Sequence, residues 1–86
     1  MTISVVIPLY NEEENVAELH RRVKSAMDGT GKEYEVIYVD DGSTDRTLPL
    51  LQDIQSADRN AVVLSLRRNF GQTAAFAAGF DYARGT

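Results

Sequence analysis

Two adjacent carboxylates, Asp40 and Asp41, directly follow a run of β-forming residues, Val36 to Val39. Desolvation and mutual repulsion both oppose burying two like charges at the end of a strand. In one interpretation, the pair and the segment from Gly42 to Asp45 form a capped, solvated turn that binds no ligand. Alternatively, the strand aims its carboxylates at a ligand with hydrogen-bond donors, such as a nucleoside base or a ribose. One charge-assisted contact of this kind contributes about 1.5–3 kcal/mol.

Two other segments carry groups suited to the same kind of ligand. Tyr10 follows an apolar run near the N-terminus and offers a flat ring, and stacking a base on such a ring is worth ~1–3 kcal/mol. Packing of Tyr10 against the start of the next helix is the alternative. Arg67 and Arg68 follow a third apolar run and could face a diphosphate or remain solvated surface charges. Gly71, just beyond them, precedes a helix whose first amides could bind an anion.

The elements that must position these groups alternate along the chain. Three nearly continuous apolar runs predict strands that are covered on both faces, at residues 3–7, 34–39 and 61–66. Between them, apolar residues recur at helical spacing. Asn11 is expected to cap the first helix, with Glu14 completing a capping box, and Gly29 ends that helix. The second helix is expected to begin near residues 44–45, and the third follows Gly71 and runs to about Arg84. Small residues in the third helix allow its backbone to lie close to a sheet.

This alternation predicts an α/β fold, a parallel β-α-β-α-β-α arrangement with right-handed crossovers. In open parallel sheets, ligands bind beyond the carboxyl ends of the strands. Short loops should therefore bring three strand tips to one edge, where Asp40 and Asp41 would lie. The tips are Pro8 to Asn11, Asp40 to Ser43, and Arg67 to Gly71.

Length and composition narrow the classes of function. A chain of 86 residues forms one domain at most, and its formal net charge of −4 argues against nucleic-acid binding. The absence of cysteine excludes disulfides and thiolate metal sites. The only histidine, His20, falls within the first predicted helix, and we expect it at the surface or its boundary rather than in catalysis.

Taken together, the three tips resemble glycosyltransferase family 2, in its polyprenyl-phosphate branch of dolichyl-phosphate mannosyltransferases and undecaprenyl-phosphate glycosyltransferases. The resemblance is carried by three motifs that occur in the expected order and at the expected spacing. They extend over Val5 to Val16, Val39 to Thr47, and Arg68 to Gly79. Each motif alone is weak, and the three in order are specific.

The resemblance implies a Rossmann-like glycosyltransferase A fold, of which residues 1–86 would be the N-terminal, nucleotide-sugar-binding portion. It implies transfer of a sugar from a UDP- or GDP-sugar to a polyprenyl phosphate. The implied nucleotide-binding residues are Pro8, Tyr10, Asn11, Glu12, Asp40 and Asp41. Those expected near the diphosphate or sugar are Arg68, Asn69, Gly71 and Gln72.

The resemblance also implies features that this chain is not expected to supply. The family uses Mg²⁺ or Mn²⁺ on an Asp-x-Asp motif that follows a fourth strand, which would lie beyond Thr86. The 86 residues alone are therefore expected to be inactive, and the full-length protein is expected at the cytoplasmic face of the membrane. Without a fourth strand, the first strand is expected to be an exposed edge through which the chain self-associates. The alternative function is a stand-alone nucleotide-binding or regulatory module without catalysis.

Overall fold

The computed structural model describes residues 2–66, 77–80 and 82–83, and within them the predicted alternation of strands and helices is confirmed. The elements are β1 (Ile3–Leu9), α1 (Val16–Asp28), β2 (Tyr34–Asp40), α2 (Thr47–Ala57) and β3 (Ala61–Ser65). The strands form one parallel sheet in the order β1-β2-β3. The fold is therefore the predicted α/β arrangement, consistent with the N-terminal half of a Rossmann-like glycosyltransferase A fold.

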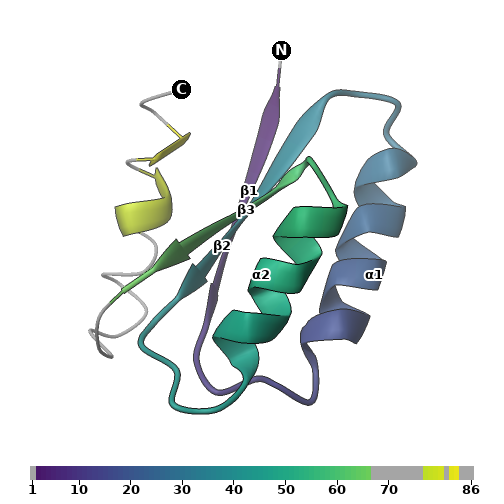
Figure 1. The fold of residues 1–86 in the computed structure, drawn as a ribbon. Helices are drawn as coiled ribbons and strands as arrows, with labels where there is room; N and C mark the ends of the chain where they lie inside the picture. The colour runs from purple at the N-terminus through teal and green to yellow at the C-terminus, as the bar shows by residue number, and fades with distance from the viewer. Residues whose placement is uncertain (1, 67–76, 81, 84–86) are drawn as a thin grey trace.

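The sheet is covered on both sides (Figure 1). Helices α1 and α2 pack on one face, over a core that includes Val36, Tyr38 and Leu51. On the other face, Ile37 and Val39 contact helical residues near the C-terminus. Because successive side chains of a strand point to opposite faces, a strand covered on both sides is expected to be apolar at successive positions, as β2 is from Val36 to Val39. This explains the continuous apolar run of β2.

The described part of the predicted third helix, residues 77–80 and 82–83, is helical and lies close to the sheet. Gly79 is buried there, and a Cβ at this position would overlap Cγ1 of Val6 and lie 3.3 Å from Cγ2 of Val39. The absence of a side chain therefore permits the close approach that the small residues of this segment predicted.

Three strand boundaries differ from the prediction, and one of them is the end of β3 at Ser65, one residue before the predicted Leu66. β1 continues through Pro8 to Leu9, and β2 includes Asp40. The amide of Ile3 donates to Glu33, so the amides of Ser4, Val6 and residue 8 alternate to the side of β1 away from β2. Pro8 lacks an N–H at a position where the β1–β2 pairing needs none, so the proline does not end the strand.

Candidate functional site

The first two predicted tips meet at the carboxyl edge of the sheet. Leu9 pairs with Asp40 in the register of β1 and β2, and the amide of Asp41 donates to the carbonyl of Leu9 at 2.9 Å. The loops that follow the two strands therefore start from neighbouring points. This part of the predicted convergence is confirmed.

A pocket of about 180 Å³ lies at this edge and is lined by Pro8, Leu9, Tyr10, Glu12 and Asp41. The Tyr10 side chain is 41% exposed, although it is large and aromatic, so its ring is available for stacking. Asp41 is only 4% exposed and supplies a carboxylate to the same pocket. The pocket thus combines a flat ring with two carboxylates, those of Glu12 and Asp41.

Asp40 has a different environment from Asp41. It is 1% exposed and is not among the residues that line the pocket. Its Oδ2 atom accepts a long hydrogen bond, 3.4 Å, from the amide of Ser43, whereas Oδ1 is buried without a hydrogen-bond partner. Gly42, with φ of 75°, makes possible the turn that brings the Ser43 amide to Asp40. The two adjacent carboxylates therefore separate, one into the pocket and one beneath the loop.

The predicted role of Asn11 as a helix cap is wrong. Helix α1 begins at Val16, and Asn11 adopts a left-handed backbone with φ of 51°. Its Oδ1 atom accepts a hydrogen bond from the amide of Thr44, in the loop after β2, at 2.8 Å. The carbonyl of Glu12 accepts the amides of Asn15 and Val16 at the start of the helix. Asn11 therefore joins two loops instead of capping its own helix.

The second helix also begins later than predicted, at Thr47. Asp45 precedes it and accepts the Thr47 amide at 2.9 Å, so this aspartate does serve the helix start. Pro49 falls in the first turn, where a missing N–H costs no helical hydrogen bond.

Residues 43–47 have a second role that the sequence interpretation missed. Their side chains accept successive amides of the loop after β1: Asn11 to Ser43, Glu12 to Thr47, and Glu13 to Asp45. The signal in the sequence was a cluster of short hydroxyl and carboxylate side chains, which bind backbone amides readily. We name this group of contacts the amide clasp.

The third predicted tip cannot be assessed in the same way. Arg68, Asn69, Gly71 and Gln72 lie outside the described residues, as does Arg67. The structure does bring the end of β3 to the same edge, because the amide of Leu66 donates to the carbonyl of Asp40 at 2.9 Å.

The described residues do not fit a divalent metal site. No group of three or more His, Cys, Asp or Glu side chains gathers among residues 2–66, 77–80 and 82–83 in a way that could hold a metal ion. The orphan Oδ1 of Asp40 is a single buried oxygen, and Mg²⁺ requires near-octahedral oxygen coordination. No step of a reaction is therefore assigned to a metal in this part of the chain.

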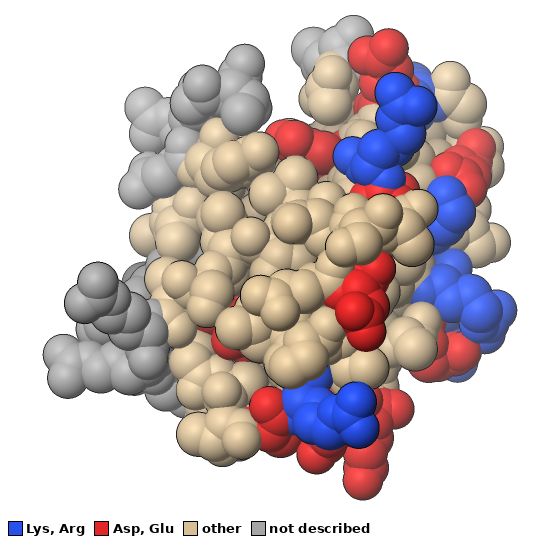
Figure 2. Space-filling view, viewed as in Figure 1, with Lys and Arg blue, Asp and Glu red and all other residues tan. Residues whose placement is uncertain are grey.

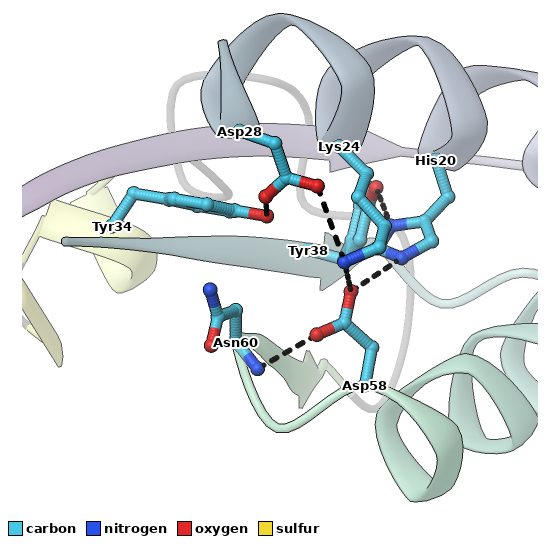
Figure 3. Close-up of polar contacts among 7 residues, drawn as sticks. All are labelled: His20, Lys24, Asp28, Tyr34, Tyr38, Asp58 and Asn60. Atoms are coloured by element: carbon cyan, nitrogen blue, oxygen red, sulfur yellow. Dashed lines mark hydrogen bonds and ion pairs between the residues drawn. The ribbon is translucent and has the colours of Figure 1, made fainter. Parts of the chain in front are cut away.

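A larger pocket, about 520 Å³, is lined by His20, Lys24, Asp58 and neighbouring residues and lies toward the amino end of β3. Figure 3 shows that its polar side chains face one another. His20 contacts the hydroxyl of Tyr38 at 2.7 Å and Asp58 at 2.9 Å, and Lys24 pairs with both Asp28 and Asp58. Because these groups already satisfy one another, we assign the smaller pocket, not the larger one, as the candidate site.

The rest of the described surface offers little for other classes of ligand. On the face shown in Figure 2, Lys and Arg side chains lie beside Asp and Glu side chains rather than forming one broad basic area. Within the portion of the chain that the structure covers, no helix has the length and apolar character required to cross a bilayer.

Comparison with known proteins gives consistent matches. The family model described as Glycosyl transferase family 2 matches residues 4–86. An "Undecaprenyl-phosphate 4-deoxy-4-formamido-L-arabinose transferase" of Pseudomonas fluorescens (strain SBW25) is 49% identical over 84 residues, covering 96% of this chain and 25% of that protein. The protein of the same name from Edwardsiella ictaluri (strain 93-146) is 44% identical, covering 96% of this chain and 26% of its own length. The chain spans about a quarter of the length of these curated relatives.

Proposed function

Because the chain belongs to glycosyl transferase family 2, we propose that residues 1–86 form the nucleotide-sugar-binding portion of an enzyme that transfers a sugar to a polyprenyl phosphate. The observation that carries this proposal is the pocket at the carboxyl edge of β1 and β2, with Tyr10, Glu12 and Asp41 around it. It occupies the region where open parallel sheets bind nucleotides.

The size and charge of the pocket support a role in holding the nucleoside. Its volume of about 180 Å³ is below the roughly 300–1,000 Å³ of pockets that enclose a drug-sized ligand, so it suits part of a nucleotide sugar. Among the residues that the structure describes, none that lines the pocket is a cation. Two carboxylates repel a diphosphate but accept hydrogen bonds from base N–H groups and ribose hydroxyls. The nucleoside would therefore enter this pocket, with the diphosphate directed away from it.

Each pocket residue then has a distinct role. Asp41 would accept a base N–H, the Tyr10 ring would stack on the base, and Glu12 would accept a ribose hydroxyl. Pro8 would form part of the apolar wall. Asp40, beneath the loop, would support the turn that presents Asp41. Arg68, Asn69, Gly71 and Gln72 remain our proposed contacts to the diphosphate or sugar.

The donor and acceptor are proposed from the relatives. Both named relatives act on undecaprenyl phosphate and 4-deoxy-4-formamido-L-arabinose, according to their names. We propose a UDP- or GDP-sugar donor and a polyprenyl-phosphate acceptor for the protein that contains this chain, acting at the cytoplasmic face of the membrane. A bound Mg²⁺ or Mn²⁺ would offset the charge of the diphosphate leaving group, with ligands from outside the described residues.

The edge of β1 supports a further proposal, that the 86-residue chain self-associates. Among the described residues, β1 has a strand neighbour only on the β2 side. Its other side presents the amides of Ser4 and Val6, and unpaired strand edges pair readily with another chain. The expected product is a pair of chains joined through β1.

Calorimetry of the 86-residue chain with UDP, GDP and CDP, each with and without Mn²⁺, tests the nucleoside pocket. Replacing Asp41 by Asn should weaken the preferred nucleotide by ~1–3 kcal/mol, because an acceptor becomes partly a donor. Tyr10→Ala should also weaken it, whereas Tyr10→Phe should retain the stacking. Equal affinity of wild type and Asp41→Asn for every nucleotide would remove Asp41 from the site. Tight, metal-independent binding by a stable monomer would favour a non-catalytic binding module.

A further inference from the structure

The amide clasp joins two loops that are far apart in the sequence. The amides of Asn11, Glu12 and Glu13 donate to Ser43 Oγ at 2.9 Å, Thr47 Oγ1 at 2.8 Å and Asp45 Oδ2 at 3.3 Å. Three consecutive amides in a loop commonly form a binding site for a phosphate. Here their donors already have acceptors within the chain, so this loop does not serve as the diphosphate site.

Thr47 is the buried centre of the clasp. It is 0% exposed, and its hydroxyl accepts from the Glu12 amide while donating to Asp45 Oδ1 at 2.6 Å. The same Asp45 oxygen accepts the Thr47 amide at 2.9 Å. The Thr47 hydroxyl therefore acts once as an acceptor, for the Glu12 amide, and once as a donor, to Asp45. Loss of the hydroxyl would leave the Glu12 amide without its acceptor.

The clasp acts on both walls of the candidate pocket. Glu12, whose amide it holds, lines the pocket directly, and Tyr10 immediately precedes the clasped residues. On the other side, Ser43 accepts the Asn11 amide and donates its own amide to Asp40, next to Asp41. The left-handed backbone of Asn11, a conformation that L-residues other than Asn and Asp rarely adopt, is held by contacts to Ser43 and Thr44.

We propose that Ser43, Asp45 and Thr47 are positioning residues of the nucleoside pocket, which fix Tyr10 and Glu12 relative to Asp41 without touching the ligand. None of the three lines the pocket. This inference rests on the proposed function, because it assigns the pocket walls to a nucleoside. It predicts that binding depends on a hydroxyl that lies behind the pocket wall.

The test compares Thr47→Val, which keeps the shape but removes the hydroxyl, with Thr47→Ser, which keeps the hydroxyl. Tyr34→Phe is the control, because it removes a hydroxyl bonded to Asp28 near the amino end of β2. All variants are measured at a temperature where circular dichroism shows each to be fully folded. Calorimetry with UDP and GDP should give about tenfold weaker binding for Thr47→Val, and wild-type affinity for Thr47→Ser and Tyr34→Phe.

A second measurement needs no ligand. Amide hydrogen exchange followed by NMR should be about tenfold or more faster at Glu12 in Thr47→Val, and nuclear Overhauser contacts between the Tyr10 and Asp41 loops should weaken. Unchanged affinity of Thr47→Val, with fast exchange at Glu12, would overturn the positioning role. If the wild type binds neither nucleotide, the proposed function fails. The contacts between the two loops in Thr47→Val then decide the inference: their loss supports it, and their persistence overturns it. If Thr47→Val does not fold, Asp45→Asn replaces it, with Glu13 as the reporting amide.

Discussion

Nε2 of His20 lies 2.9 Å from Oδ2 of Asp58, although the two residues are 38 positions apart in the chain. The contact joins α1 to the end of α2, and Nδ1 of the same ring contacts the hydroxyl of Tyr38 on β2 (Figure 3). When the ring donates from Nε2, it serves Asp58 as donor and Tyr38 as acceptor. One imidazole therefore connects three elements of the helix-covered face.

Replacing His20 by Ala should lower the free energy of unfolding by about 2 kcal/mol, because the fully buried Tyr38 hydroxyl loses its acceptor. Urea unfolding followed by circular dichroism measures the change. Arg21→Ala is the control, since its ion pair with Glu18 joins side chains that are 70% and 48% exposed, and exposed ion pairs contribute little to stability. In a Tyr38→Phe background, His20→Ala should cost less. Equal costs in both backgrounds would contradict the coupling.

Gly79→Ala should destabilise the fold by about 1–3 kcal/mol through overpacking against Val6. Gly29→Ala is the matched control, because a Cβ there would meet its nearest atom, a backbone oxygen, at 3.4 Å and φ is −65°. Thermal unfolding of both variants gives the comparison, and Val6→Ala should partly restore Gly79→Ala. A Gly79→Ala variant as stable as the Gly29→Ala variant would show that the C-terminal segment does not pack against β1 as described.

Stability should fall at alkaline pH because of Tyr38. Burial raises the pKa of Tyr38, and the charges of Asp58 and Tyr34 raise it further. A folded-state pKa above the unfolded value of about 10 means that the contribution is complete below that pH and is lost as pH rises beyond it. Urea midpoints between pH 8 and 11 should decline, and Tyr38→Phe should decline less steeply. Parallel profiles for the two proteins would assign the loss to other groups, such as Lys24.

Stability should also fall in acid, through Asp58. Burial alone would raise the pKa of Asp58, but hydrogen bonds from the Asn60 amide and from His20, with the charge of Lys24, outweigh it and lower the pKa. The contribution is present above the ordinary carboxyl pKa of about 4 and is lost as pH falls through the lower folded value. Asp58→Asn should therefore have a flatter unfolding profile between pH 5 and 2 (about the window of the lowered pKa) than the wild type. A wild-type slope in that variant would exclude Asp58 as the source.

Self-association through β1 should respond to one amide. Ser4→Pro removes an N–H from the side of β1 that faces away from β2, whereas Ser4→Ala keeps it, and both lose the contact with Glu35. Sedimentation at increasing concentration should show pairing for wild type and Ser4→Ala and a monomer for Ser4→Pro. Wild type that stays monomeric throughout, with slow exchange at Val6, would reject this mode of pairing.

The sequence allowed the order of elements and the meeting of the first two loops to be predicted, because both follow from local patterns and from the topology of parallel sheets. The ends of the strands were harder to predict. Proline usually breaks a strand, and Pro8 is tolerated in β1 only because its nitrogen lies on the side away from β2. Asp40 and Asp41 were both predicted to bind the nucleotide, but of the two only Asp41 lines the pocket, and the buried position of Asp40 depends on packing that the sequence does not show.

The capping of Asn11 was mispredicted for a related reason. Short polar side chains accept any amide within reach, and the sequence does not say whether that amide lies in the same helix or, as for Asn11 and Thr44, 33 positions away. The partners of His20 could not be predicted either, because Tyr38 and Asp58 become its neighbours only after α1 and α2 pack on the sheet.

Pro8 sets a limit on any strand that adds to β1. Such a strand would find backbone donors at Ser4 and Val6 but only a carbonyl at Pro8. The pairing therefore lacks one hydrogen bond two residues before Tyr10. Whichever chain supplies that strand, the missing hydrogen bond favours its separation from β1 before the pocket, so that Tyr10 and Asp41 remain open to a ligand.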